Sequence, residues 1–306
     1  MNNICVTQNE RTQLQRLGAQ RHLYSTAKLV FLVQVVLSGP VAVAFAFSAL
    51  VWPEMKGFAA LFGLVLTAAD IFAITPWRKN LTDTAAKIQE AFDCDVLEMP
   101  WHSLKAGKRI DPEVEIEHSI QYQKVAQSFP PLSDWYSAAV APLPISVARV
   151  VCQRTNCYWD SKQRRKYALW IVCGVLGVVV AIFVIGLLSG LTVEALILRA
   201  LTPLMPAIVI AVRQFTEHRD AARRLDTLKD HANQLFEEAC SNPDAPDLLA
   251  HSRALQDEIF DSRKRSPPVL DQIFRRIRTA YEVEMNLTAA KLAESAAEKI
   301  GIKRIN

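Results

Sequence analysis

The sequence predicts an all-α membrane protein with two transmembrane helical hairpins (four spans) plus a cytosolic helical domain. No charged residue occurs from Tyr167 to Val193. At about 1.5 Å per helical residue, that length crosses a hydrocarbon core of about 30 Å. A second charge-free run extends from Leu29 to Pro53. The composition agrees, because 51% of the residues are hydrophobic and the mean hydropathy is +0.12.

The run Leu29–Pro53 is followed by a short turn and a further apolar run, Gly57–Trp77, which forms the return span of hairpin 1. Asp70 interrupts this run. A carboxylate within a span costs a few kcal/mol on insertion scales, and a functional role is the default interpretation. We therefore expect Asp70 to pack against protein or to line a pore.

The run Ala195–Val212 is the return span of hairpin 2 and carries Arg199, Pro203 and Pro206. Two prolines predict a broken helix that neighbouring helices or a cavity must support, because backbone polar groups in lipid need partners. Arg199 either reaches the nearby headgroups or has a function inside the membrane. Since this run leads directly into a predicted helix, Gln214–Cys240, it is our candidate for a gate.

The distribution of Lys and Arg predicts the orientation. The two hairpin turns hold only Lys56, with Arg199 shortly after the second turn. The opposite flanks hold the basic residues Arg11, Arg16, Arg21, Lys28, Arg78, Lys79, Lys162, Arg164, Arg165, Lys166, Arg213, Arg219, Arg223 and Arg224. Basic flanks face the cytoplasm, so both termini do too. The predicted parts are a cytosolic N-terminal helix (1–28), hairpin 1 (29–77), a cytosolic helical insert (78–166), hairpin 2 (167–212) and a cytosolic C-terminal helical region (213–306).

Local signals predict the cytosolic helices. Asp111-Pro112 is typical of a helix start and predicts a helix reaching toward Gln127. The charge-free run Tyr136–Ala148 is too short to span a membrane, so we expect a buried or interfacial piece. An apolar stripe on the Gln214–Cys240 helix predicts either an oligomer seam or a face packed on the insert; it consists of Leu225, Leu228, Ala232 and Leu235.

The chain holds no signature of the enzyme classes that short motifs reveal. It lacks a glycine-rich phosphate loop, Gly-x-Ser-x-Gly and His-Glu-x-x-His. Its six histidines stand in polar contexts, and we expect surface or capping roles for them. We interpret Asp257, Glu258 and Asp261 as a solvated helix face rather than a metal site, and the six scattered cysteines as free thiols. Since the net charge is only +4, we expect neither a DNA nor an RNA partner. Because the motifs of catalysis are missing, we also expect neither an enzyme nor a cofactor.

One polar and aromatic cluster suits a nucleotide, because arginine pairs bidentately with phosphate and an aromatic face stacks on a base. Its members, which are our candidate ligand residues, are Arg154, Asn156, Tyr158, Trp159, Asp160, Gln256, Asp257 and Arg263. The same side chains would equally serve as interhelical salt bridges and N-caps that hold a cytosolic bundle together. The residues alone leave both interpretations open.

The order of short motifs along nearly the whole chain resembles the SMODS-associated four-transmembrane effector family of bacterial cyclic-oligonucleotide-based antiphage signalling systems (CBASS). The matching pieces are Asn3–Gln8, Tyr24-Ser-Thr-Ala-Lys28, Ala85–Asp93 with Trp101, Asp134-Trp-Tyr136, Cys152–Asn156 with Tyr158-Trp-Asp160, and Leu255–Phe260 with Arg263 and Pro268. Their joint order is more specific than any one motif.

The resemblance implies an effector in the bacterial inner membrane that acts after phage infection. The expected ligand is a cyclic di- or trinucleotide made by a co-encoded nucleotidyltransferase, and the expected effect is membrane disruption that arrests or kills the cell. We also expect a homo-oligomer in a lipid bilayer. Two alternatives remain open at this point: a channel or transporter that is constitutive or otherwise regulated, and a membrane scaffold that recruits a cytosolic partner.

Overall fold

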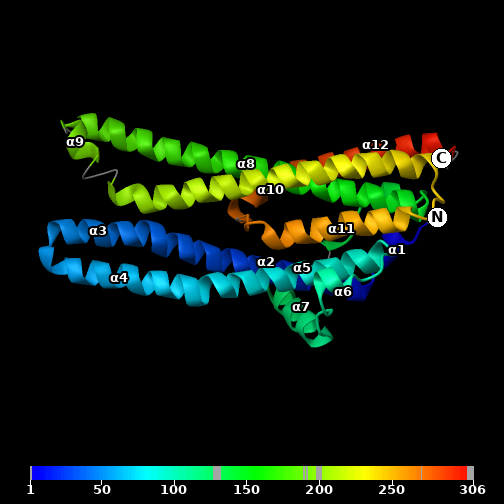
Figure 1. Cartoon of the computed structure of the whole chain (residues 1–306), viewed down its shortest axis with the longest axis horizontal. Coiled ribbons are helices and arrows are strands. Elements are labelled where there is room, and N and C mark those ends of the chain that lie inside the picture. The colour runs from blue at the N-terminus through cyan, green and yellow to red at the C-terminus, as the bar shows by residue number, and fades with distance from the viewer. Residues whose placement is uncertain are drawn as a thin grey trace.

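The computed structural model describes residues 2–126, 132–188, 190, 192–197, 202–269 and 271–301. These residues form an elongated bundle of helices without a strand (Figure 1). The elements, in chain order, are α1 (Ile4–Thr7), α2 (Arg11–Val36), the π-helix η1 (Leu37–Val41), α3 (Ala42–Val51), the 3₁₀ turn η2 (Pro53–Met55), α4 (Lys56–Ala69), the π-helix η3 (Asp70–Ile74), α5 (Thr75–Val96), α6 (Ser103–Ala106), α7 (Pro112–Ala126), the 3₁₀ turn η5 (Ala138–Val140), α8 (Ile145–Leu188), α9 (Val193–Leu196), α10 (Thr202–Ser241), α11 (Leu248–Arg265) and α12 (Asp271–Ile300).

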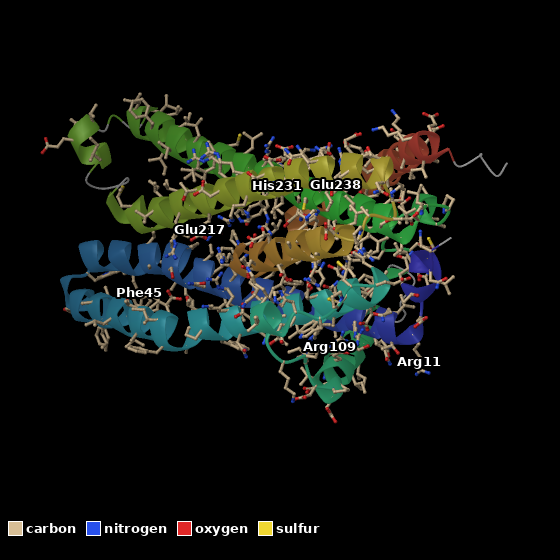
Figure 2. All side chains as sticks on the ribbon, turned by 45° about the vertical axis from the view of Figure 1, so that its right-hand side comes forward. Arg11, Phe45, Arg109, Glu217, His231 and Glu238 are labelled. Atoms are coloured by element: carbon tan, nitrogen blue, oxygen red, sulfur yellow. The ribbon has the colours of Figure 1, made fainter. Side chains whose placement is uncertain are left out.

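One end of the bundle, which we call the apolar half, contains α3, α4, α9 and the adjoining parts of α2, α8 and α10 (Figure 1). Large apolar side chains are exposed there, such as Leu64 at 71% and Phe72 at 81%. An exposed apolar surface of this extent fits contact with lipid rather than water. Figure 2 shows that nitrogen and oxygen atoms gather over the opposite end, the polar half.

Among the described residues, three helical stretches are long and apolar enough to cross a membrane: Arg11–Phe45, Gly57–Val96 and Ile145–Leu188. The predicted fourth span falls partly on residues 198–201, which lie outside the described residues, as does Arg199. The chain is helical in α9 and again from Thr202. Pro203 therefore stands in the first turn of α10, where proline is tolerated, whereas Pro206 lies one turn further and cannot donate to the Thr202 carbonyl.

Several helices run without interruption from one half of the molecule into the other. The longest is α8, whose 44 residues at 1.5 Å per residue measure about 66 Å. About half of that length exceeds what a hydrocarbon core of about 30 Å can cover. A helix of this kind therefore connects the core of the polar half rigidly to a span.

The hydrophobic core lies in the polar half and is built from α5, α8, α10 and α11, with Phe92, Val151 and Ile259 at most 2% exposed. Part of the apolar stripe of α10 belongs to it: Ala232 and Leu235 are 0% and 7% exposed. Of the two interpretations left open, the structure therefore supports packing within the chain. Val140, Val147 and Ala148 are also buried, which confirms a buried piece in the charge-free run Tyr136–Ala148, whose last residues form the start of α8.

Candidate functional site

Two carboxylates of α5 and two guanidinium groups of α11 form a buried charge network in the polar half. The side chains of Glu90 and Asp93 are 2% and 0% exposed, and three-residue spacing puts both on the face of α5 toward α11. Arg253 Nη2 donates to Glu90 Oε1 at 2.5 Å, and Arg263 Nη1 donates to Asp93 Oδ2 at 2.6 Å. These pairs fasten the helix that continues the second span to the C-terminal region.

The electrostatics of this network follow from its burial. Burial, followed by repulsion from Asp93, raises the pKa of Glu90 above its ordinary value, while the two arginines oppose the shift. Burial lowers the pKa of Arg263, but the nearby carboxylates Asp93 and Glu90 outweigh it and the net direction is upward. The two shifts have different origins: burial and a like charge disfavour the ionised form of Glu90, whereas the adjacent carboxylates favour the ionised form of Arg263.

Two of the predicted ligand residues, Gln256 and Asp257, complete the network. Gln256 Nε2 donates to Glu90 Oε2 and to Asp93 Oδ2, both at 2.9 Å. Asp257 Oδ1 accepts from Arg253 Nη2 at 2.9 Å, and its Oδ2 lies 2.6 Å from His102 Nδ1. Asp257 is only 7% exposed, so the expectation that it lies on a solvated helix face is wrong.

Glu258 and Asp261, which the sequence analysis grouped with Asp257, contact a different partner. Glu258 Oε1 and Asp261 Oδ2 both accept from Lys105 Nζ on α6, at 3.2 and 3.1 Å. The described residues hold no group of three His, Cys, Asp or Glu side chains arranged for a metal ion. These two carboxylates therefore fix α6 against α11.

The predicted residues of α8 divide between two places. Asn156 Nδ2 donates to the Tyr136 hydroxyl at 3.2 Å, which donates to Asp93 Oδ1 at 2.7 Å, so Asn156 extends the buried network. Arg154 Nε instead donates to Asn233 Oδ1 on α10 at 2.5 Å. Asp160 Oδ1 forms an ion pair with Arg164 Nε on the next turn, at 2.9 Å. The eight candidate residues are thus not gathered around one open cavity.

Tyr158 and Trp159 form a separate aromatic group on the side of α8 that faces α12. Their rings meet edge to face with centroids 5.7 Å apart. Lys162 Nζ lies 5.7 and 5.6 Å from the two ring centroids, within cation–π range. Glu284 of α12 binds this group through both carboxylate oxygens: Lys162 Nζ is 2.6 Å from Oε2, and the Tyr158 hydroxyl is 3.3 Å from Oε1.

Asp70 lies where hairpin 1 departs from regular α-helix. It begins the π-helix η3, and a second π-helix, η1, follows Gln34 on the facing span. Gln34 Nε2 donates to Asp70 Oδ1 at 2.6 Å, and Thr75 Oγ1 donates to the same atom at 3.1 Å. The carboxylate therefore packs against protein, which is the first of the two expected roles. π-Helical turns of this kind are frequent at functional sites.

The family model described as the SMODS-associating 4TM effector domain matches residues 2–292. The chain belongs to this family. A curated relative, a probable CBASS effector molecule of Bacillus cereus (strain VD146), is 20% identical over 231 residues, which cover 72% of this chain and 75% of the relative. No solved structure matches. The resemblance seen in the motifs is thus confirmed, and the family and the relative's name point to a transmembrane effector of CBASS.

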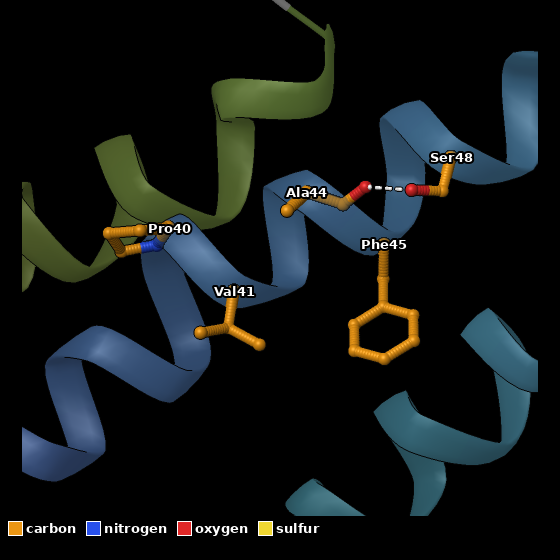
Figure 3. A pocket seen from close by; sticks show the side chains of 5 residues that line it. All are labelled: Pro40, Val41, Ala44, Phe45 and Ser48. Carbon is orange, nitrogen blue, oxygen red and sulfur yellow. Dashed lines mark hydrogen bonds between the residues drawn. The ribbon is translucent and has the colours of Figure 1, made fainter.

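Two cavities of the 4TM effector differ in volume and in the residues that line them. A hollow of about 280 Å³ on hairpin 1 is lined by Pro40, Val41, Ala44, Phe45 and Ser48 (Figure 3). Its only hydroxyl, that of Ser48, already donates to the carbonyl of Ala44 at 2.9 Å. No charged group lines it, so a phosphate would have no partner there.

The second cavity lies in the polar half, between α8, α12 and the segment around η5. Tyr136, Thr155, Asn156 and Ala289 are among its lining residues, and its volume is about 10 Å³. Such a space holds about one water molecule. Binding of a nucleotide at this place therefore requires α12 to move away from α8.

The buried network also contains candidate residues that the sequence analysis did not single out: Glu90, Asp93, His102, Arg253 and Gln153, whose Nε2 donates to Gln256 Oε1 at 3.1 Å. The available signal was the spacing of Glu90 and Asp93, which puts both acids on the same helix face as Ala86; all three residues are buried.

His218 was expected at the surface, yet it is 0% exposed and its ring centroid lies 4.4 Å from that of Tyr167. Burial, with Arg164 as a second cause, lowers the pKa of His218 to about 3. His22 and His118 stack across α2 and α7 with Nδ1 atoms 3.1 Å apart. The sequence contexts of these residues are polar, but their helices bury His218 completely and the His22–His118 pair in part.

Proposed function

We propose that this 4TM effector senses a cyclic di- or trinucleotide in its polar half and, in response, disrupts or permeabilises the bacterial inner membrane. The polar half and both termini lie in the cytoplasm under this proposal, where a co-encoded nucleotidyltransferase releases the messenger. The protein acts without catalysis and without a cofactor. Its membership in the family and the name of the curated relative support the role in antiphage defence.

The observation that carries the coupling is the continuity of α8. The same helix holds Asn156, Tyr158 and Lys162 in the polar half and continues to Leu188 in the apolar half. An α-helix of this length is stiff along its axis, so a displacement at its first half is transmitted to the span. The messenger must bind one arrangement of the helices more tightly than the other, because tight binding alone shifts no equilibrium.

The arrangement of hairpin 2 favours a response in the membrane. α8 packs along α10, and α10 packs in turn against η1 and α3 of hairpin 1. A movement of α8 therefore changes the contact between the two hairpins. We propose that copies of the chain assemble around this contact, and that the Asp70 side of hairpin 1 and the Arg199, Pro203 and Pro206 side of hairpin 2 form or border the path that opens.

Dye release from liposomes tests this function. Purified full-length protein is reconstituted into vesicles that contain a self-quenched fluorophore, and cyclic di-AMP, cyclic di-GMP, cyclic GMP–AMP and cyclic tri-AMP are added separately. Linear dinucleotides and protein-free vesicles are the controls. We expect release with at least one cyclic nucleotide and none with its linear form. If no product of the neighbouring nucleotidyltransferase causes release, the proposed gating is wrong.

Two other outcomes would favour the competing functions. Equal release with and without nucleotides would favour a constitutive channel, to which the intramembrane Asp70 would be equally suited. Nucleotide binding without release, together with unchanged phage protection after neutral substitutions of Asp70 and Arg199, would favour a scaffold that recruits a partner protein. Each outcome is separated from the proposal by a single measurement.

A further inference from the structure

The seam between α8 and α12 holds a carboxylate in a setting that suits a phosphate. Glu284 Oε2 accepts from Lys162 Nζ at 2.6 Å, and Glu284 Oε1 contacts the same ammonium and accepts from the Tyr158 hydroxyl at 3.3 Å. Hydrogen bonding to Lys162 holds the pKa of Glu284 below its ordinary value; desolvation opposes this shift, while the Tyr158 hydroxyl and the charge of Lys166 support it. One carboxylate is thus held by an ammonium and a hydroxyl.

The side chains around the Glu284 carboxylate suit a nucleotide better than a bare inorganic anion. The Tyr158 and Trp159 rings contact each other edge to face, and the Lys162 ammonium lies within 6 Å of both ring centroids. Aromatic faces stack on bases of any sequence, while an ammonium and a hydroxyl bind the phosphodiester beside them. This combination separates the group from an ordinary interhelical ion pair.

The contact with Glu284 is also easy to exchange. The side chains of Lys162 and Glu284 are 29% and 43% exposed, and ion pairs of such exposure add little to stability. By contrast, the network around Asp93 is closed to solvent, with side-chain exposure of 0% for Asp93. A ligand can therefore displace Glu284 at small cost but cannot enter the buried network without breaking the fold.

The neighbouring cavity continues the same seam. Thr155 and Asn156 lie three and two residues before Tyr158 on α8, and Ala289 lies five residues beyond Glu284 on α12. These three residues line the space of about 10 Å³ described above. Separation of α12 from α8 at Glu284 would widen that space in the direction of Asn156, which offers an amide to a base edge.

We propose that Tyr158, Trp159 and Lys162 form the seat for one phosphodiester and its adjoining base of the cyclic oligonucleotide, and that Glu284 occupies the phosphate position in the messenger-free protein. Binding displaces Glu284 and releases α12 from α8, the helix that continues into the membrane. This inference rests on the proposed function, since it names where the messenger binds. It also assigns an autoinhibitory role to Glu284.

The test measures binding of the same four cyclic nucleotides to full-length protein in detergent by calorimetry. Wild type should bind at least one of them. Lys162→Ala should weaken that binding by about 10-fold or more, because one charge-assisted contact is lost. Glu284→Gln should strengthen it by about 3- to 10-fold, because the competing anion is gone while the helix contact keeps its shape.

The chain supplies a matched control at the other end of α12. Lys299 pairs with Glu237 of α10 and lies 5.5 Å from the ring centroid of Phe236, so it is also an exposed ion pair beside an aromatic ring. Glu237→Gln loosens α12 in the same chemical way but removes no anion from the seat. We expect wild-type affinity for Glu237→Gln and for Lys299→Ala.

The outcomes separate this inference from the function on which it rests. Wild-type binding with unchanged affinity in Lys162→Ala and Glu284→Gln overturns the proposed seat and leaves the sensing function standing. An equal gain in Glu284→Gln and Glu237→Gln also overturns it, because a general loosening of α12 then explains the effect. Absence of binding by wild type to every nucleotide, together with absence of dye release, overturns both.

Discussion

Substitution of Arg263 by alanine should destabilise the protein strongly, because this residue neutralises the most buried carboxylate of the polar half. Its Nη1 lies 2.6 Å from Asp93 Oδ2, and the two side chains are 10% and 0% exposed. At an effective dielectric constant of about 20, Coulomb's law gives about 6 kcal/mol for this separation. Breaking a buried pair by removing one partner costs about 3–5 kcal/mol.

The remaining contacts of Asp93 limit this loss. Without Arg263, the carboxylate keeps hydrogen bonds from the Tyr136 hydroxyl at 2.7 Å and from Gln256 Nε2 at 2.9 Å. A hydrogen bond to a charged group contributes about 1.5–3 kcal/mol, so these two contacts keep the loss within the range above. At about 2–4 °C per kcal/mol, we expect the midpoint of thermal unfolding in detergent to fall by about 10 °C.

Arg265→Ala is the matched control for this measurement. It stands two residues further along α11, its side chain is 69% exposed, and its contact with Asp261 is 3.4 Å long. We expect a change of at most about 0.5 kcal/mol. The double variant Asp93→Leu/Arg263→Met should recover most of the loss, because it leaves no buried charge unpaired. Equal midpoints for Arg263→Ala and Arg265→Ala would refute this account, and loss of messenger binding at unchanged stability would assign Arg263 to the ligand instead.

Two further predictions concern buried polar groups with different surroundings. Neither ring nitrogen of His218 has a hydrogen-bond partner among the described residues, so His218→Leu should stabilise the protein by about 1–3 kcal/mol in thermal or chemical unfolding. Because the pKa of His218 falls from 6.5 to about 3 on folding, the unfolded chain takes up the proton first; wild type should lose stability between pH 6.5 and pH 3, and this part of the loss should be absent in the variant. In hairpin 1, Gln34→Leu should cost about 1–3 kcal/mol by leaving the Asp70 carboxylate without its partner on the facing span, and Gln34→Leu/Asp70→Leu should recover it. A double variant as unstable as Gln34→Leu would contradict this pairing.

The apolar runs and the helix starts were the predictable part of the fold. A charge-free run such as Leu29–Pro53 indicates a lipid environment directly, because water does not favour so long an apolar surface. Likewise, Asp111-Pro112 predicts the start of α7, and the structure begins that helix at Pro112. The extent of α8 was not predictable in this way. Its polar first half and its apolar second half look like separate elements until packing on α10 shows one continuous helix.

The candidate site was only partly accessible, since pairing is a property of the fold and not of either residue. Arg263 and Asp93 are 170 positions apart in the sequence, and the residues near either one do not indicate its partner. The residue types suited to a nucleotide are also those that close a buried network. What distinguishes the two uses is exposure, which separates Lys162 and Glu284 at the surface from Glu90 and Asp93 in the interior.

The energetics of the proposed switch favour the α8–α12 seam over the buried network as its trigger. A shift of the helices from 1:99 to 99:1 needs a difference of about 10⁴-fold in messenger affinity between the two arrangements. Stacked bases at about 1–3 kcal/mol each, together with charge-assisted phosphate contacts, can supply this difference. If entry required breaking the pairs of Arg253 and Arg263, their cost would cancel most of that gain. A messenger that exchanges for Glu284 keeps the core intact, so the binding energy is left to move α8 and, through α10, the contact with η1 in the membrane.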